Sequence, residues 1–273
     1  MTKMKWLTGI AMMLACGAVA DAECNGTVPP KRMTIVEELF APHSVILFQG
    51  DSITHGGRLR DMNHYLGHGY QAEIAMRYLA YRPDLRLQFG NRGVSGHTSS
   101  NLVARWHHDA VPYTPDESGY DGVFPGERNK PRVPDVLSIL IGINDYLRKS
   151  DGWFVPVADY ERNLRFMVTN SLAANPKMKI VLCEPFRLPE DTDPDFLARQ
   201  ATVRRVATDY NLVFVPFQKL FSEELLKEEP RPRYWFWDAF HPTYAAHMRM
   251  ADFWIATVAR EFASGKGNPS LRR

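Results

Sequence analysis

The stretch VILFQGDSIT, residues 45–54, carries a continuous apolar run directly into Gly50, Asp51 and Ser52. Its first four residues are apolar without alternation, which is typical of a strand covered on both faces in a parallel sheet. Further short apolar runs recur at residues 85–89, 136–141, 179–183 and 212–215. We therefore predict a sheet of five parallel strands, with Ser52 at the carboxyl end of the first strand.

Helical patterns separate these runs, at residues 71–82, 101–108, 160–172, 196–209 and 242–262. Pro242 suits the first position of the last helix, because a proline lacks the N–H group that would be unpaired there. Strands that alternate with helices favour right-handed crossovers and an α/β fold, a three-layer α/β/α sandwich. The sequence has no internal repeat and no linker of low complexity, so residues 23–273 are predicted to form a single domain.

Residues 111–134 interrupt this alternation with five prolines, three glycines and mixed charges. The segment is longer than most connections inside compact domains. It leads from a helix back to the start of the third strand, so we expect it at the edge of the sheet opposite the carboxyl ends of the strands. Its predicted role is a surface loop or a contact within a homo-oligomer.

The amino terminus, residues 1–22, has the pattern of a signal peptide. Lys3 and Lys5 precede an uncharged apolar stretch, and small residues at 18–20 and 20–22 fit the rule for leader cleavage. Cleavage after Ala22 removes two of the 33 Lys and Arg and one of the 31 Asp and Glu, and it leaves 251 of the 273 residues with a net charge of +1. The sequence therefore predicts an exported protein that is periplasmic, secreted or an outer-membrane lipoprotein.

The composition restricts the partners. An apolar content of 45% and a charged content of 23% are ordinary for a globular protein. The near-neutral charge argues against nucleic acid and against an anionic membrane surface as partners. After the leader, no stretch reaches the roughly 18 uncharged residues of a membrane span.

The cysteines Cys16, Cys24 and Cys183 show no CxxC spacing and no surrounding His cluster, which argues against a zinc site. Cys16 follows a Met-Leu-Ala sequence that resembles a bacterial lipoprotein signal, so a lipid anchor and a simple cleaved leader both remain open. Cys24 could pair with Cys183 in an oxidising compartment. Cys183 also fits a buried core thiol, because it lies in an apolar run.

Polar residues follow the first three predicted strands and precede the last predicted helix. Ser52 follows the first strand, Gly96 lies in the loop after the second, and Asn144 follows the third. Asp238 lies three residues before His241, a spacing that lets a carboxylate orient an imidazole as the base for a serine. Taken singly, these motifs also fit turns, a helix cap or a surface Asp–His pair. Together they predict one site at the carboxyl edge of the sheet.

These blocks, in this order, resemble the SGNH hydrolases, also called the GDSL esterase family, over about residues 44–256. The resemblance implies a flavodoxin-like fold with a five-stranded parallel sheet in the order 2-1-3-4-5. It also implies a serine esterase in which Ser52 is the nucleophile, His241 is the general base and Asp238 is the partner of His241.

The same resemblance implies an oxyanion hole. Its donors would be the backbone N–H groups of Ser52 and Gly96 and the side-chain amide of Asn144. Such an enzyme requires no metal and no cofactor. His97 stands where the family more usually has Asp or Asn.

Longer motifs resemble the bacterial acetylxylan esterase branch of this family. They lie at residues 50–58, 66–70, 91–93, 138–145, 184–186 and 234–235. This resemblance implies an acetylated oligo- or polysaccharide, such as acetylated xylan, as the substrate. The candidate substrate contacts are Asp51, Arg92, Phe186 and Trp235. Rigid aromatic rings suit stacking on sugars, although the aromatic and arginine side chains also fit core packing or salt bridges.

Two other functions remain open. A broad short-chain esterase or lysophospholipase would need a long apolar groove, for which the sequence shows no obvious helix or flap. A non-catalytic sugar-binding protein on the same fold would be expected to lack a residue of the triad or of the oxyanion hole. None of these residues is missing.

Overall fold

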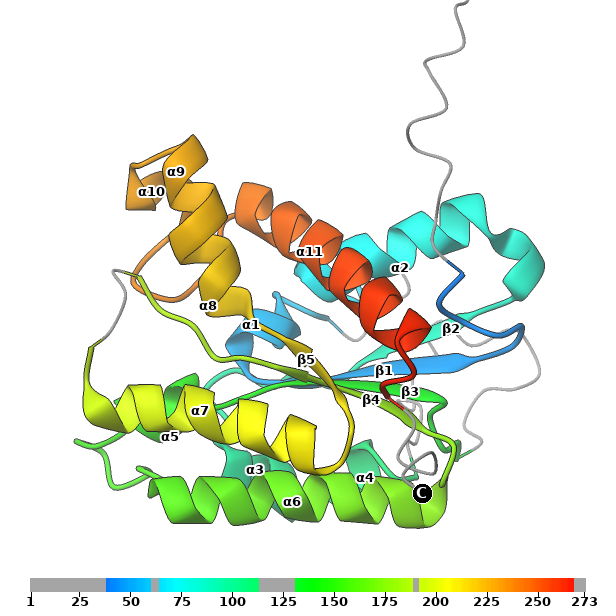
Figure 1. The fold of residues 1–273 in the computed structure, drawn as a ribbon, viewed down its shortest axis with the longest axis horizontal. Helices are drawn as coiled ribbons and strands as arrows, with labels where there is room; N and C mark the ends of the chain where they lie inside the picture. The colour runs from blue at the N-terminus through cyan, green and yellow to red at the C-terminus, as the bar shows by residue number, and fades with distance from the viewer. Residues whose placement is uncertain (1–37, 60–63, 113–130, 189–191, 268–273) are drawn as a thin grey trace, which may run out of the picture. The chain divides into compact units, whose positions relative to one another are not determined.

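Five parallel strands form the centre of the structure, a computed structural model that describes residues 38–59, 64–112, 131–188 and 192–267. The strands are β1 (Val45–Gly50), β2 (Gln88–Asn91), β3 (Val136–Leu140), β4 (Lys179–Cys183) and β5 (Val213–Val215). They run in the order β2-β1-β3-β4-β5 (Figure 1). The predicted flavodoxin-like sheet is confirmed.

The pairing of β1 with β3 explains why their sequences are continuously apolar. Ile46 of β1 lies opposite Val136 of β3, and every residue of both strands is buried. Successive side chains of a strand point to opposite faces of a sheet. Ile46 therefore belongs to the apolar core on one face, while Leu47 belongs to the core on the other.

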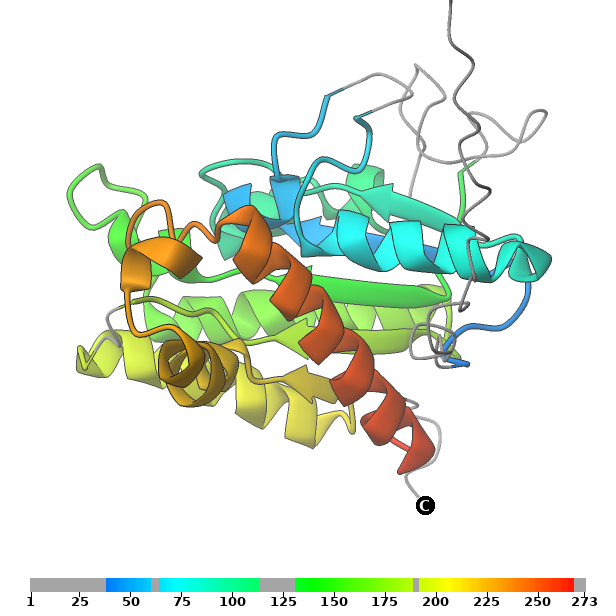
Figure 2. The same cartoon turned by 90° about the horizontal axis from the view of Figure 1, so that it is seen from above.

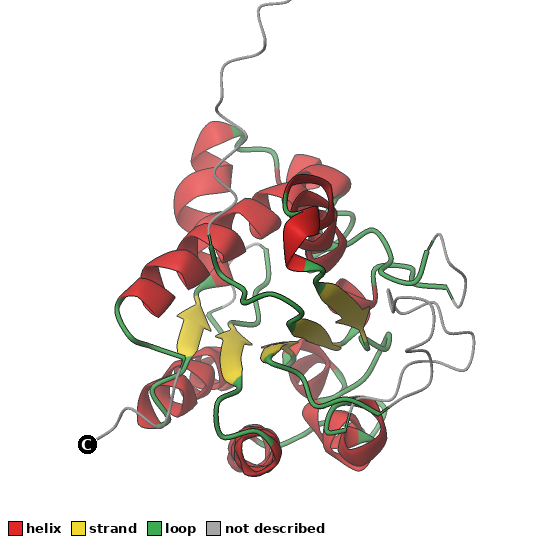
Figure 3. Cartoon of the chain, turned by 90° about the vertical axis from the view of Figure 1, so that its right-hand side faces the viewer, coloured by secondary structure: helices red, strands yellow, loops and turns green. Residues whose placement is uncertain are grey.

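Helices cover both faces, as predicted for a three-layer sandwich (Figure 3). On one face α2 (Tyr70–Tyr81) and α11 (Tyr244–Ala263) lie side by side (Figures 1 and 2). The opposite face carries α3 (Ser99–Ala104), α4 (Trp106–Asp109), α6 (Val157–Ala174) and α7 (Pro194–Asp209) (Figure 1). The largest fully buried side chains include Trp254 on the first face and Trp106 on the second.

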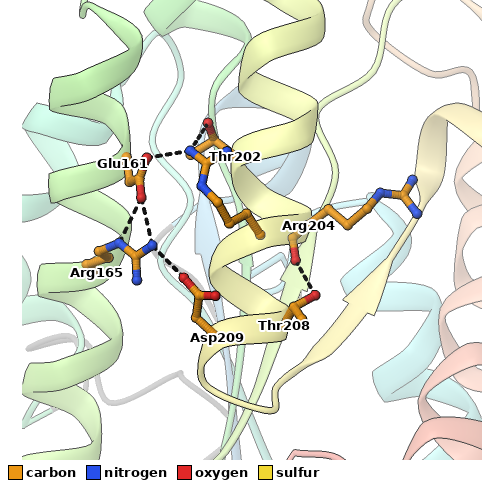
Figure 4. Close-up of polar contacts among 7 residues, drawn as sticks. Glu161, Arg165, Thr202, Arg204, Thr208 and Asp209 are labelled. Atoms are coloured by element: carbon orange, nitrogen blue, oxygen red, sulfur yellow. Dashed lines mark hydrogen bonds and ion pairs between the residues drawn. The ribbon is translucent and has the colours of Figure 1, made fainter.

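Exposed ion pairs join α6 to α7 on the second face (Figure 4). Arg165 of α6 donates to Asp209 of α7 at 2.6 Å and to Glu161 of its own helix at 2.7 Å. Glu161 also pairs with Arg205 of α7. Exposed pairs of this kind contribute about 0–1 kcal/mol each, so the apolar core between these helices and the sheet must supply most of the attachment.

The last helix begins later than predicted. Helix α11 starts at Tyr244, and the Thr243 side chain accepts a hydrogen bond from the Ala246 N–H as the cap. Pro242 lies before this cap, in an isolated antiparallel bridge with Phe236. The prediction that Pro242 opens the helix is therefore wrong. Pro242 is held in the bridge to Phe236 and Thr243 caps the helix with its side chain, so the first helical residue is Tyr244.

Several short elements were not predicted. They are α1 (Ser52–His55), η1 (Pro83–Leu85), α5 (Ile143–Leu147), α8 (Phe217–Lys219), η2 (Leu220–Leu225), α9 (Leu226–Glu228) and α10 (Pro232–Trp235). Two of them, α1 and α5, directly follow β1 and β3. They therefore lie where the predicted site residues emerge from the sheet.

Several sequence predictions fall outside the described residues. These are the signal peptide, Cys16, Cys24 and most of residues 111–134, of which 113–130 are not described. Cys183 is buried and has no disulfide partner among the described residues, and burial raises the pKa of its thiol to about 12. In the same part of the chain, no helix is both long and apolar enough to cross a membrane.

Candidate active site

Ser52, His241 and Asp238 form a hydrogen-bonded chain at the carboxyl edge of the sheet. Ser52 is the first residue of α1, immediately after β1. Its Oγ lies 2.8 Å from Nε2 of His241, and Nδ1 of His241 lies 2.7 Å from Oδ2 of Asp238. The structure thus brings the three predicted triad residues together in the order that a serine nucleophile needs.

The turn that presents Ser52 requires small residues and a cap. A Cβ atom on Gly50 would lie 2.4 Å from the Leu140 carbonyl oxygen and 2.4 Å from Oγ1 of Thr54. A larger residue at position 50 would therefore push α1 away from β3. Asp51 accepts a hydrogen bond from the Ile53 N–H at 3.0 Å and so begins α1 immediately after the strand.

Asp238 is held by two backbone donors as well as by the imidazole. Its Oδ1 accepts the N–H groups of Phe240 at 2.9 Å and His241 at 2.8 Å. Burial opposes ionisation, but the hydrogen bonds from His241 and from these amides outweigh it and lower the pKa of Asp238. The carboxylate is therefore ionised at neutral pH and accepts the Nδ1–H of His241. We accordingly assign the tautomer that leaves Nε2 free to accept the Ser52 hydroxyl proton.

The predicted oxyanion residues lie on two segments that contact each other. Residues 93–98, hereafter the oxyanion loop, follow β2, and Asn144 lies in α5 after β3. Nδ2 of Asn144 donates to the His97 carbonyl oxygen at 3.1 Å. An amide carries two N–H donors, so one remains for a ligand. Gly96 has a φ of +78°, in the left-handed region that favours glycine.

The oxyanion loop also rests on the segment that carries Ser52. A Cβ atom on Gly93 would lie 2.3 Å from the His55 backbone nitrogen in α1. The Val94 N–H donates to the Gly50 carbonyl oxygen at 3.1 Å. The oxyanion loop thus lies against α1 and against the residue that ends β1.

The residues predicted to contact substrate are buried. The exposed fractions of Asp51, Arg92, Phe186 and Trp235 are 1%, 6%, 0% and 4%. Phe186 lies among the rings of Phe217, Phe221 and Phe236. Nε1 of Trp235 donates to the Glu229 carbonyl oxygen at 2.9 Å.

The structure gives three of these residues a structural role. Asp51 caps α1, and Phe186 and Trp235 lie in the core. Burial raises the pKa of Asp51 to about 7, despite the hydrogen bond from Ile53 and with a smaller rise from Asp145. For all four residues a substrate contact stays a prediction.

Sequence reasoning missed the aromatic residues that are exposed beside the triad. Trp237 is 57% exposed and Tyr244 is 63% exposed. Their ring centroids are 6.0 Å apart with the planes at 85°. Trp237 directly precedes Asp238, and the backbone N–H of Trp237 donates to the His241 carbonyl oxygen at 2.8 Å. This adjacency is the signal in the sequence that could have favoured Trp237 over Trp235.

Within residues 38–59, 64–112, 131–188 and 192–267, no group of three or more His, Cys, Asp and Glu side chains could hold a metal ion. The polar groups gathered at Ser52 are the hydroxyl, imidazole, carboxylate and amide groups described above.

Comparison with known proteins gives one family match. The model of the GDSL-like Lipase/Acylhydrolase family matches residues 48–249. A curated relative, the acetylxylan esterase of Geobacillus stearothermophilus, is 32% identical over 236 residues, which cover 81% of this chain and 96% of the relative.

Solved structures agree with this match. A GDSL-like lipase from Parabacteroides merdae superposes with a TM-score of 0.69 at 33% identity, covering 80% of this chain and 97% of the other. Axe2, an acetylxylan esterase of Geobacillus stearothermophilus, superposes with a TM-score of 0.67 at 29% identity. This match covers 80% of this chain and 95% of Axe2. Catalytic mutants of Axe2 replace a serine, an aspartate and a histidine by alanine, with the aspartate three positions before the histidine.

Proposed function

The chain belongs to the GDSL-like lipase/acylhydrolase family and is a carboxylic ester hydrolase, and from this premise we propose that it removes acetyl groups from xylan-type carbohydrates through an acyl-enzyme on Ser52. The observation that carries the mechanism is the hydrogen-bonded chain from Ser52 through His241 to Asp238. The similarity to an acetylxylan esterase over 96% of that protein's length supports the substrate class.

In the first step Oγ of Ser52 attacks the acetyl carbonyl carbon while Nε2 of His241 takes the hydroxyl proton. The ionised Asp238 stabilises the imidazolium that forms. The negative charge on the carbonyl oxygen is met by the N–H groups of Ser52 and Gly96 and by the free N–H of the Asn144 amide. The tetrahedral adduct then collapses, His241 returns the proton to the sugar oxygen, and the sugar leaves as an alcohol.

In the second step water hydrolyses the acetyl-Ser52 ester. His241 removes a proton from the water as its oxygen attacks the acyl carbon, and the same donors meet the second oxyanion. Collapse releases acetic acid, and the proton on His241 returns to Oγ of Ser52. The cycle consumes one ester and one water, and it yields one alcohol and one acid, with no other reactant.

Acetate release from defined esters tests the substrate proposal. We expect the protein to deacetylate acetylated xylo-oligosaccharides, and to hydrolyse p-nitrophenyl acetate with a kcat/KM at least about tenfold above that for p-nitrophenyl octanoate, since no long apolar groove is expected at the site. Acetylated pectin and chitin fragments form the comparison set. Strong activity on long acyl esters together with none on acetylated xylan would favour the lysophospholipase or lipase alternative.

The exposed ring of Trp237 gives a second test of the carbohydrate proposal. We expect Trp237→Ala to lower kcat/KM on acetylated xylo-oligosaccharides by about 3- to 10-fold, the value of one lost aromatic contact, and to leave p-nitrophenyl acetate hydrolysis within about twofold of wild type. The control for loss of an exposed ring is Tyr81→Ala, because Tyr81 is the last residue of α2 and is 45% exposed. An equal loss on both esters would show that Trp237 supports the triad rather than the sugar.

A further inference from the structure

Helix α5 and Arg148, the residue at its C-cap, reach the oxyanion loop with one side chain each. Asn144 and Arg148 are four residues apart, and residues with this spacing lie on the same side of a helix. Nδ2 of Asn144 donates to the His97 carbonyl oxygen, and Nη1 of Arg148 donates to the Gly96 carbonyl oxygen at 2.9 Å. One short helix and its C-cap residue therefore hold two consecutive carbonyl groups of the loop.

We propose that Arg148 is a positioning residue that fixes the direction of the Gly96 N–H toward the oxyanion. The inference rests on the proposed function, in which this N–H is an oxyanion donor. Arg148 itself touches neither the triad nor the reacting atoms. It acts through the backbone of Gly96.

Gly96 needs such a restraint because packing does not provide one. A Cβ atom on Gly96 would have open space around it, with Nη1 of Arg148 as the nearest atom at 3.8 Å. By contrast, Gly93 in the same loop is wedged against α1. A glycine in open space samples many backbone angles, so its N–H is directed by hydrogen bonds. The Gly96 carbonyl group shares a peptide plane with the His97 N–H, which donates to the Val94 carbonyl oxygen at 3.2 Å. Arg148 holds the carbonyl side of this plane, and a fixed plane on the carboxyl side of Gly96 limits the directions that its own N–H can take.

The guanidinium of Arg148 is itself fixed. Its Nε donates to Oδ2 of Asp151 at 2.8 Å, and the backbone N–H of Arg148 donates to the Asn144 carbonyl oxygen at 3.1 Å. A planar guanidinium that a carboxylate already holds loses little further freedom when it binds a second group. Arg148 therefore transmits the rigidity of α5 to the loop.

A second arginine holds the loop from its other side but does not replace Arg148. Nε of Arg105 donates to Nδ1 of His97 at 3.2 Å, and Nη2 of Arg105 donates to the Gly50 carbonyl oxygen at 3.3 Å. Because Nε of an arginine can only donate, His97 must accept and is neutral at Nδ1. Arg105 thus holds a side chain of the loop, whereas Arg148 holds the backbone of Gly96.

The test replaces Arg148 by residues that cannot reach the carbonyl group. In Arg148→Met and Arg148→Gln the stem is retained and the guanidinium is lost. We expect kcat on p-nitrophenyl acetate to fall about 10-fold with KM within about twofold of wild type, since a misplaced donor weakens the transition state more than the ground state. Arg148→Lys keeps a donor that can reach Gly96, so its kcat should lie between the neutral variants and wild type.

Arg162→Met is the matched control. Arg162 pairs with Asp159 at the same three-residue spacing, is exposed, and lies on α6. Its kcat and KM should equal those of wild type. Melting curves identify a variant that does not fold, and either neutral variant suffices for the comparison.

Three results would overturn the proposal: a kcat of the neutral variants within twofold of wild type, a change in KM instead of kcat, or no recovery in Arg148→Lys. None of them would touch the proposed function, which fails separately if the wild-type protein hydrolyses no acetyl ester.

Discussion

Ser52→Ala is expected to lower kcat on p-nitrophenyl acetate by about 10⁴- to 10⁶-fold, the range found when a triad serine is removed. In the proposed mechanism Oγ of Ser52 bonds to the acyl carbon, and this oxygen is hydrogen-bonded to Nε2 of His241. The residual rate would come from the oxyanion donors and from substrate binding. Stopped assays of p-nitrophenol release, with long incubations for the variant, measure this loss.

The melting temperature and a second serine variant are the controls for this result. The Ser52 side chain is partly exposed and its hydroxyl contacts a half-exposed imidazole, so the melting temperature should stay within about 3 °C of wild type. Ser264→Ala removes a serine just past the far end of α11 and should change neither activity nor melting. Full activity of the Ser52→Ala variant would contradict a mechanism in which Ser52 is the nucleophile.

Combining Ser52→Ala with His241→Ala separates a triad from two independent residues. Members of a triad act as a unit, and their effects on kcat are far from additive. The double variant should therefore be no slower than Ser52→Ala within about threefold. A further loss of several orders of magnitude would mean that His241 acts on the ester without Ser52.

The sheet could be predicted because its strands carry an unambiguous pattern. β1 and β3 are buried on both faces, so their sequences are continuously apolar and mark both the strands and their place in the sheet. Once the strands are placed, their carboxyl ends are placed too. This is why Ser52 and Asn144, which follow β1 and β3, could be assigned to one edge from the sequence.

The short helices could not be predicted in the same way. α5 spans five residues and α10 spans four, which is too short for a 3.6-residue period to appear. The position of α10 depends on tertiary packing, because Trp235 is buried in the core on one face of the sheet. Without α10, the sequence does not tell which rings of residues 234–237 face solvent, and only the resemblance to the esterase branch selects Trp235.

The buried candidates show a second limit of the sequence. Asp51 follows an apolar strand and precedes the nucleophile, a placement that fits either a substrate contact or a helix cap. The choice depends on the direction of its side chain, which points to the Ile53 N–H. Phe186 fits a pocket wall and a core ring equally well, and the ring contacts with Phe217 and Phe221 decide for the core.

Asn144→Ala is expected to give the next largest loss, about 10²- to 10³-fold in kcat, the usual effect of removing one oxyanion donor. KM should change little, because the ground-state carbonyl oxygen needs this donor less than the tetrahedral oxyanion does. The rate of inactivation by a p-nitrophenyl phosphonate should fall in parallel, since its phosphoryl oxygen would occupy the oxyanion position. Asn163→Ala, which removes an amide that donates to Ser99 and Ser100, is the matched control.

In the proposed mechanism Asn144 has two functions that this variant removes together, and the Arg148 variants separate them. The amide holds the His97 carbonyl group and, in the proposed mechanism, also donates to the oxyanion, whereas Arg148 holds only the backbone of the same loop. If both functions exist, Asn144→Ala should be at least about 10-fold slower than Arg148→Met. Equal losses in the two variants would mean that Asn144 positions the loop without touching the oxyanion, and that the backbone N–H groups of Ser52 and Gly96 stabilise the charge alone.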